Sequence, residues 1–480
     1  MRRITRATRD AIDYAVSSDQ GKTWKIKDKV ITSPYSTTRG DTTQFPNQTY
    51  YYGDGDQRLL VDTASGYFYV YYGSRVVDKN GGWNGFSEHV ARAPISQKMA
   101  PGSWQKYFEG KWQTDGLGGK ESNIVSTSTT YPDCYVPTAK DYNPANTGTA
   151  SQQIAAGKLL KRSDLFVMNV SYSAYLGMYI GTPETDGIQP LHFYGTKDLA
   201  TQKWTDLGAA PNYSTSSWYR WMVDSATGTT GNILGKTFRS YCSISCSKQA
   251  NGNQSDGEYV DVTIGSSAPA APVVDPAKAY LIKSGAGTIL TPAGNATAAK
   301  STPTGAASEA WRFRSNNDGS YSITNADSGL ALGVPTTTAN RAWGTAPVLG
   351  ALSASNVGQQ WFVQAQSDQS GNFRIINRYS GLVISLGSAK VQTSPFRNWS
   401  NSGTGTADTS TPQSQTLSLQ ETSVSSSAFT LVGAASSRCL ETAAQSTVQR
   451  CNGGYWRLCW RGESEMDGHR RWRAEARYQR

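Results

Sequence analysis

Histidine is scarce in this sequence, and long apolar runs are missing from it. Only three histidines occur in 480 residues, so a zinc site built from histidine ligands is not expected. No run of about eighteen apolar residues is present, so we expect no membrane-spanning helix and no membrane partner. The first residues, MRRITRATRDAIDYAV, are basic but lack the apolar segment of a signal peptide.

Charged residues are also few, at 17% of the chain, although the formal net charge is +10. The arginines crowd the two ends, and the middle offers no continuous basic stripe, which disfavours nucleic-acid binding. Glycine, serine, threonine, tyrosine and tryptophan are plentiful, and helical periodicity is rare. This composition favours an all-β protein of extracellular type, and the length predicts two to four domains.

The six cysteines suggest disulfides rather than a metal site. Cys242 and Cys246 could close a small loop, and Cys439 and Cys451 look like a second pair. Two cysteines are left without an assigned partner, Cys134 and Cys459. Disulfides favour an oxidising compartment, so we expect a secreted protein whose signal peptide lies upstream of Met1.

Residues 50–110 contain four apolar runs separated by turn-rich breaks. The runs are 58–62, 67–72, 89–95 and 104–108. They are dense in the aromatic and β-branched residues that suit a pleated surface. Four short antiparallel strands make either one propeller blade or a piece of a sandwich.

Recurrent turns favour the propeller. Residues 17–24 form a full Asp box, Ser-x-Asp-x-Gly-x-Thr-Trp, in which Asp19 is a structural hydrogen-bond acceptor and Trp24 anchors the next strand. The hairpin sequence at 60–66 is echoed at 222–228, and a sandwich has no reason to reuse it. We therefore predict a five-bladed type of propeller over residues 1–265.

The predicted blades are unequal. Residues 1–35 supply only the outer half of one, 50–115 and 215–265 each supply a whole one, and 120–210 supplies one with long insertions. Three and a half blades do not close a ring of five. We expect the missing inner strands to lie upstream of Met1.

The composition changes after the propeller. Residues 266–277 are rich in proline and alanine and predict an extended linker. Residues 278–420 repeat internally at about 40 to 50 residues, which predicts a threefold β domain. Residues 421–480 begin one further repeat and end in a basic tail that we expect to be disordered, since one repeat cannot bury a threefold core.

The second domain resembles ricin-type β-trefoil lectins. Gln359-Gln360-Trp361 matches the Gln-x-Trp signature of that family, and Glu309-Ala310-Trp311 is a variant of it. The resemblance implies a β-trefoil that binds carbohydrate. The segment from Arg438 resembles the opening of a second, truncated module with the paired cysteines of the family.

The first 265 residues resemble the five-bladed propellers of secreted bacterial glycoside hydrolases in the general pattern of strands and turns that makes up their blades. The resemblance implies three carboxylates around a central funnel, because one carboxyl must be protonated and another ionised. Asp54 and Asp56, in the sequence YYGDGDQR, stand where the modulating acid belongs, and Glu121 stands where the general acid belongs, before the next inner strand. Asp133 is an alternative acid. The general base is expected on the missing first blade.

Each candidate also has a structural interpretation. Asp54 and Asp56 flank a glycine and could be turn formers, and Glu121 could be a solvated loop residue. The aromatic residues Trp218, Tyr219 and Trp221 could stack on sugars or pack in a core. In the second domain the candidate sugar contacts, which could equally be turn residues, are Asn325, Asp327, Asn377 and Tyr379.

The sequence therefore predicts a secreted, monomeric, carbohydrate-active protein that hydrolyses a polysaccharide with carboxylates alone and needs no cofactor. One alternative is a non-catalytic glycan-binding protein with the propeller as scaffold. A weaker alternative is a sialidase-like enzyme, prompted by the Asp box, for which Arg220 and Arg239 would be members of an arginine triad.

Overall fold

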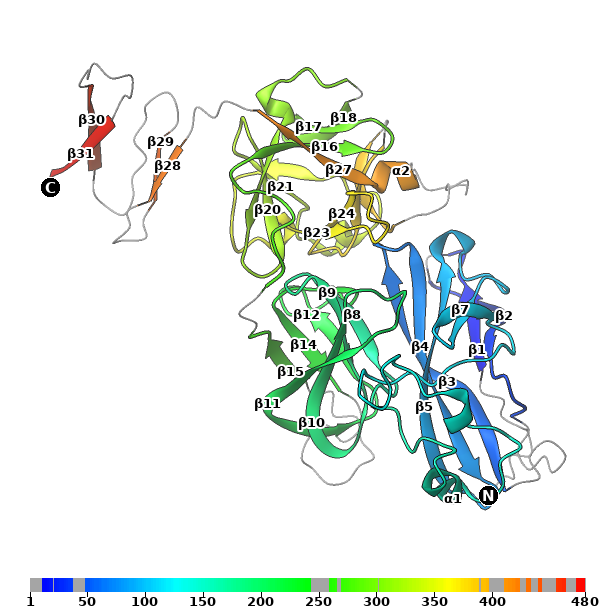
Figure 1. Cartoon of the computed structure of the whole chain (residues 1–480). Coiled ribbons are helices and arrows are strands. Elements are labelled where there is room, and N and C mark those ends of the chain that lie inside the picture. Colours follow the sequence, from blue (N-terminus) through cyan, green and yellow to red (C-terminus); the bar gives the residue numbers. More distant parts are fainter. Residues whose placement is uncertain are drawn as a thin grey trace. The chain divides into compact units, whose positions relative to one another are not determined.

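The computed structural model describes residues 11–19, 21–37, 48–242, 259–265, 269–300, 302–387, 390–396 and 410–423, and the backbone of four strands beyond them. The chain divides into two compact units, Met1–Thr422 and Ser423–Arg480, which are described separately. Regular structure in the described residues is mostly β-strand, as the composition predicts (Figure 1).

The first hairpin carries the Asp-box turn. Its strands, β1 (Ala11–Val16) and β2 (Lys25–Thr32), pair antiparallel. Asp19 accepts hydrogen bonds from the hydroxyl of Thr23 at 2.6 Å and from its backbone N–H at 2.9 Å. These hydrogen bonds, with one from Ser17, lower the pKa of Asp19 to about 2. The carboxylate is structural, as predicted, whereas Trp24 is 66% exposed and anchors no core.

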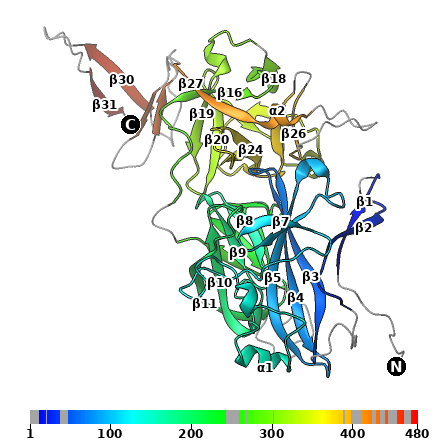
Figure 2. The same cartoon turned by 45° about the vertical axis from the view of Figure 1, so that its right-hand side comes forward.

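Residues 49–115 form five consecutive antiparallel strands (Figure 2). They are β3 (Thr49–Asp62), β4 (Tyr67–Asp78), β5 (Trp83–Pro94), β6 (Gln105–Phe108) and β7 (Lys111–Asp115). The first three strands are longer than predicted. The glycine-rich segment 53–56 lies inside β3 rather than before it, and β4 pairs with β3 on both sides of this segment. The pairing of β3 with β4 shifts between Tyr51 and Asp54 and again between Gly55 and Arg58. Such bulges keep an irregular segment within a sheet.

Two further sheets follow, with the strand orders β11-β10-β9-β8-β13 and β12-β14-β15. Their strands are β8 (Asn169–Ser173), β9 (Met178–Thr182), β10 (Thr185–Thr196), β11 (Thr205–Ser217), β12 (Trp221–Asp224), β13 (Ile233–Leu234), β14 (Thr237–Tyr241) and β15 (Tyr259–Thr263). Because β13 pairs with β8 in parallel, the stretch 215–265 shares a strand with the preceding sheet and is not the self-contained blade that the sequence predicts.

The segment after Glu121 contains no strand, although the sequence predicts an inner strand there. Residues 116–168, all of them described, hold a 3-10 helix (Thr138–Lys140), α1 (Ala150–Ala155) and isolated bridges at Leu117, Arg162 and between Ile124 and Tyr135. A further 3-10 helix, Ile95–Gln97, follows β5. Ile124 is nonetheless fully buried, and Arg162 bridges Phe86 of β5, so this loop packs in the core and contributes single bridges rather than a strand.

The repeated hairpin turn has the same structure in both places. Asp62 and Asp224 each accept, through the backbone carbonyl, a hydrogen bond from a glycine four residues later, at 3.0 Å from Gly66 and 2.8 Å from Gly228. Both glycines have positive φ, 75° and 63°, which side chains disfavour. The hairpin sequence that occurs at 60–66 and again at 222–228 therefore forms the same turn in both places.

Residues 279–422, called here the repeat domain, form one twelve-stranded sheet. Its strands are β16 (Ala279–Ser284), β17 (Ile289–Ala293), β18 (Ala296–Lys300), β19 (Trp311–Ser315), β20 (Ser320–Asn325), β21 (Ala331–Gly333), β22 (Val348–Gly350), β23 (Gln360–Ala365), β24 (Phe373–Asn377), β25 (Val383–Leu386), β26 (Val391–Ser394) and β27 (Leu417–Thr422). The short helices are three of 3-10 type, Ala307–Glu309, Thr338–Arg341 and Val357–Gln359, and α2 (Pro412–Gln415). Pairing of β16 with β27 brings the two ends of the domain together.

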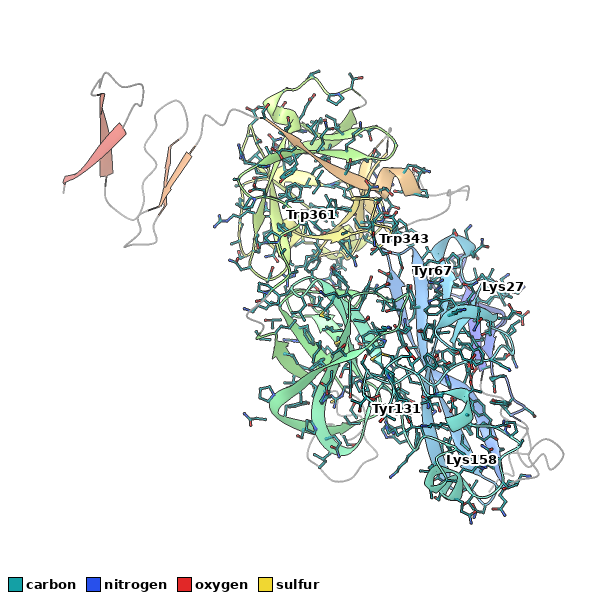
Figure 3. The ribbon with its side chains drawn as sticks, viewed as in Figure 1. Lys27, Tyr67, Tyr131, Lys158, Trp343 and Trp361 are labelled. Atoms are coloured by element: carbon teal, nitrogen blue, oxygen red, sulfur yellow. The ribbon has the colours of Figure 1, made fainter. Side chains whose placement is uncertain are left out.

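The two tryptophans of the repeat occupy equivalent places. Trp311 and Trp361 are both fully buried, and Trp361 lies among the strands of the repeat domain in Figure 3. The indole N–H of Trp311 donates to the Leu290 carbonyl at 3.0 Å, and that of Trp361 donates to the Leu332 carbonyl at 2.8 Å. The internal repeat predicted from the sequence is confirmed at this position.

The repeat domain packs against the N-terminal sheets and is not connected to them by an extended linker alone. Arg378 forms a buried ion pair with Asp224 of β12 at 2.9 Å and contacts Asp318 within its own domain at 2.5 Å. The predicted linker takes part: the Ala270 N–H donates to the carbonyl of Tyr175 at 2.9 Å, and Val274 is buried in the core of the repeat domain.

The second unit contains two hairpins. β28 (Phe429–Val432) pairs with β29 (Cys439–Thr442), and β30 (Tyr455–Gly462) pairs with β31 (Trp472–Gln479). The tail after residue 455, expected to be disordered, thus includes paired strands. Cys451 lies outside the described residues, so its pairing with Cys439 stays a prediction.

The ion pair between Arg378 and Asp224 should be a main determinant of stability. Replacing Arg378 with Met leaves Asp224 buried without its counter-charge, which costs about 3–5 kcal/mol. Urea unfolding followed by tryptophan fluorescence measures the loss. As a control, Arg239→Met breaks the exposed pair with Asp261 and should have a far smaller effect. Equal effects of the two variants would contradict the proposed importance of this contact.

Candidate functional site

Two of the predicted catalytic carboxylates, Asp54 and Glu121, meet around one lysine. Lys106 of β6 lies 2.5 Å from Glu121 Oε2 and 3.4 Å from Asp54 Oδ2, and it donates to the carbonyl of Thr32 at 2.8 Å. The side chains of Asp54 and Lys106 have no exposed surface, and that of Glu121 is 2% exposed. We call these three residues the buried ion cluster.

The two carboxyls of the buried ion cluster have opposite protonation preferences. Burial and the charge of Glu121 raise the pKa of Asp54 well above its usual value. Burial also acts on Glu121, but Lys106 and His89 outweigh it and lower the pKa of Glu121 to about 2. Asp54 therefore holds a proton more readily than an ordinary carboxyl, beside an ion pair of Lys106 with Glu121.

Further polar side chains close the cluster off. Tyr72 donates to Glu121 at 2.8 Å and Tyr51 donates to it at 3.1 Å. His89 lies 2.7 Å from the hydroxyl of Ser74 through Nε2 and 2.9 Å from the carbonyl of Ser122 through Nδ1. The cluster thus joins β3 and β6 to the loop at Glu121, with Tyr51, Tyr72 and His89 packed around it.

Asp56 lies in a different environment, at the wall of an open pocket of about 500 Å³. The pocket is lined by Asp56, Gln57, Arg58, Tyr219, Arg220, Trp221, Tyr241 and Cys242. Asp56 forms an ion pair with Arg75 at 2.5 Å and accepts a hydrogen bond from the Tyr219 hydroxyl at 2.8 Å. The wall of the pocket is thus formed by β3, by the segment that leads into β12 and by the end of β14.

Glu184, which the sequence analysis did not select, lies close to Asp56. It directly precedes β10 and is buried, with a carboxylate oxygen 3.8 Å from Arg162 Nη2. Its Oε2 has no hydrogen-bond partner among the described residues. Burial raises the pKa of Glu184 to about 8, with Asp56 adding to the shift and Arg162 and Arg75 opposing it. Glu184 is therefore a carboxylic acid that keeps its proton at neutral pH.

The only sequence signal for Glu184 is its position. Thr182-Pro183-Glu184 interrupts two strand-like segments, and proline after a strand favours a break there. A charged residue in such a break is ordinarily solvated. Nothing in the sequence shows that the chain folds this carboxyl into the interior.

The remaining acidic candidate, Asp133, is exposed on a separate hollow of about 340 Å³. That hollow is lined by Glu109, Thr130, Tyr131, Pro132, Asp133, Tyr135, Pro137 and Thr138, so it shares no residue with the pocket at Asp56. Glu109 accepts a hydrogen bond from the Thr138 hydroxyl at 2.7 Å.

The aromatic candidates divide between the pocket and the surface. Tyr219 and Trp221 line the pocket, where Arg58 lies over the Tyr219 ring at 4.7 Å. Trp218 is 54% exposed, and Trp221 is 47% exposed. Trp218 and Trp221 are therefore not core residues and can contact a ligand, whereas Arg58 covers one face of the half-buried Tyr219 ring.

In the repeat domain the two asparagine candidates hold turns together. Asn325 donates to the carbonyls of Ser308 and Ala310, at 2.8 and 3.2 Å, and its side-chain oxygen accepts from backbone N–H groups of its own turn. Asn377 is fully buried and donates to the Gly358 carbonyl at 2.9 Å.

The other two candidates of the repeat domain differ in exposure. Tyr379 is 7% exposed, with Arg341 lying 4.5 Å from the centre of its ring. Asp327 is exposed. Of the four candidates, Asp327 is the one whose side chain faces solvent.

The arginines considered for a sialidase-like triad lie in different settings. Arg220 lines the pocket, whereas Arg239 pairs with Asp261 across β14 and β15 at 3.0 Å. Cys134 is buried and reduced. Cys246 lies outside the described residues, so a disulfide with Cys242 stays a prediction.

None of the helices in the described residues is long and apolar enough to cross a bilayer. Within the same residues, no three His, Cys, Asp or Glu side chains are grouped so that they could hold a metal ion.

Residues 307–399 match the protein family described as ricin-type beta-trefoil lectin domain-like. The chain therefore carries a ricin-type β-trefoil lectin-like domain, as its Gln-x-Trp motif predicts. No curated protein matches the sequence.

Solved structures resemble the chain only distantly. The designed threefold symmetric protein ThreeFoil is 18% identical, with a TM-score of 0.24 over 30% of this chain and 99% of its own. The cytolethal distending toxin from Actinobacillus actinomycetemcomitans is 16% identical, with a TM-score of 0.24 over 31% and 94%. The exo-beta-1,3-galactanase 1,3Gal43A from Clostridium thermocellum is 14% identical, with a TM-score of 0.24 over 86% and 90%. At these TM-scores the likenesses carry no argument about fold or activity.

The raised pKa of Glu184 predicts a specific pH dependence of stability. The folded state prefers the protonated acid, so its contribution is complete below the ordinary pKa of 4.5 and is lost as the pH rises towards about 8. Unfolding free energies measured from pH 4 to 9 should fall more for the wild type than for Glu184→Gln, which cannot ionise. Parallel curves for the two proteins would show that Glu184 titrates normally.

Proposed function

We propose that this chain is a carbohydrate-active protein in which a glycoside-hydrolase-like propeller acts on a polysaccharide. The sheets of the N-terminal region would be its blades. Support comes from the consecutive antiparallel order of β3 to β7 and from the repeated Asp-x-x-x-Gly turn at Asp62 and Asp224. The proposal includes an extracellular location and a monomeric state.

The observation that carries the proposed activity is a pair of carboxyls, Asp56 in the wall of the open pocket and the buried Glu184, whose pKa the charge of Asp56 helps to raise. Glu184 is protonated at neutral pH, whereas Asp56 is paired with Arg75. Glycosidic bond cleavage requires one carboxyl in each state, because one donates a proton to the leaving oxygen while the other acts as nucleophile or activates water. Exposed tryptophans beside the pocket suit the apolar faces of sugar rings.

In this proposal Glu184 is the general acid and Asp56 is the ionised carboxylate. Glu184 gives its proton to the departing oxygen, and Asp56 accepts the proton of the attacking water in the inverting case. Arg75 and Tyr219 hold Asp56 in position. The predicted catalytic residues Asp54 and Glu121 are assigned to stabilising the fold, because both carboxyls contact the buried Lys106.

Activity measurements test the assignment. We expect Glu184→Gln to lower kcat by roughly 10²- to 10⁴-fold on any polysaccharide or aryl glycoside that the wild type cleaves, with little change in KM. Wild-type activity should fall above a pH of about 8, where Glu184 loses its proton. Asp133→Asn, on the separate hollow, should keep wild-type activity. Full activity of Glu184→Gln would overturn the proposal.

The second candidate function is glycan binding without catalysis, with the N-terminal sheets as scaffold. The match of residues 307–399 to a lectin family favours it. Under either function we propose that the repeat domain binds a glycan and that Asp327 contributes, since its side chain is exposed.

A glycan array of the full chain tests this role. Asp327→Ala should weaken the signal, because it removes a hydrogen-bond acceptor from the surface, whereas Asp368→Ala, another exposed carboxylate of the repeat domain, should not. The full chain is preferable to a deletion of residues 278–420, which would uncover the buried Asp224. An unchanged signal from Asp327→Ala would remove this residue from the lectin site.

A further inference from the structure

Arg220 is a fully buried arginine in the wall of the open pocket. Its Nε, Nη1 and Nη2 atoms have no hydrogen-bond partner among the described residues. Tyr213 lies nearby and partly offsets the effect of burial, which lowers the pKa of Arg220 to about 10. An arginine of this pKa is still charged at neutral pH. No carboxylate among the described residues acts on Arg220, and a buried charge without a counter-charge costs several kcal/mol. A fold retains such a group more readily when a ligand supplies the missing acceptors.

The charges around the pocket favour an anion. Arg58 also lines the pocket, and its Nε has no hydrogen-bond partner among the described residues. The negative charge of Asp56 is already matched by Arg75, so Arg58 and Arg220 leave the wall with an excess of positive charge. The carboxyls of Glu184, Asp56 and Glu88 act on Arg58, whereas no acidic group among the described residues acts on Arg220.

The side chains that line the pocket indicate which class of anion it binds. A guanidinium is a planar fork of donors that fits a carboxylate with two parallel hydrogen bonds. Tyr219 and Trp221 add aromatic surface on the same wall, which suits a sugar ring. The volume of about 500 Å³ lies in the range of small-molecule sites.

We propose that the open pocket binds a carboxylated sugar, a uronic acid residue, and that Arg220 pairs with its carboxylate. Arg58 provides additional positive charge on the same wall. The inference rests on the proposed function in taking the ligand to be a saccharide, and it adds the substrate class: an acidic polysaccharide rather than a neutral one.

Binding of two matched sugars to the full chain tests the proposal. Methyl β-D-glucuronide and methyl β-D-glucoside differ in the carboxylate, and calorimetry at low salt should show at least tenfold tighter binding of the glucuronide. Arg220→Met should remove this preference. The variant should unfold at the same temperature as the wild type or a higher one, because it deletes a buried, unpaired charge. Arg220→Lys keeps the charge without the fork and should retain only part of the preference.

Equal affinities of the wild type for the two sugars would overturn the proposal, as would a glucuronide preference that survives in Arg220→Met. Tighter binding of methyl glucoside 6-sulfate than of the glucuronide would overturn the assignment to a carboxylate. The comparison in the wild type decides the question even if Arg220→Met fails to fold.

The outcome is separable from that of the proposed function. Cleavage of neutral glycosides that depends on Glu184, without a glucuronide preference, would leave the hydrolase proposal intact and refute the acidic subsite. A glucuronide preference that depends on Arg220, without cleavage of any glycoside, would do the reverse.

Discussion

The backbone at Asp56 is the constraint on which the candidate site depends. In a regular strand Asp54 and Asp56 would face the same side, because side chains alternate with a period of two. The pairing of β3 with β4 shifts on both sides of Asp54-Gly55, and Asp56 has a left-handed φ of 53°, which non-glycine residues rarely adopt. The bulge separates the two acids: Asp54 enters the buried ion cluster, and Asp56 reaches the pocket.

Much of the fold could be predicted from the sequence, because many of its features depend on short, local sequence patterns. The Asp box, the turns at Asp62 and Asp224 and the paired tryptophans of the repeat domain depend on a few residues each, and the structure has all of them. The failures involve longer-range pairing. The glycines at 53 and 55 indicate a break, yet a bulge accommodates them, and the short β13 joins a sheet that its position in the sequence does not suggest.

The candidate site was harder to predict, because protonation and access depend on the tertiary structure. The sequence predicts Asp54 as a modulating acid and Glu121 as a general acid, and the structure brings them together, but around Lys106 and away from solvent. The sequence contains no sign that Lys106 would be their partner. Glu184 gains its raised pKa from burial, and Arg220 its unmet donors from burial as well, neither of which a local pattern reveals.

The contacts of the repeat domain change what a lectin module can do for its neighbour. A flexible linker would only raise the local concentration of a glycan. Arg378, the contact of Ala270 with Tyr175 and the burial of Val274 instead anchor the domain to the sheets. If both proposed sites engage one polysaccharide chain, the fixed anchoring selects the number of sugar residues between them. The distance between the two sites in the protein would then determine how long the released product is.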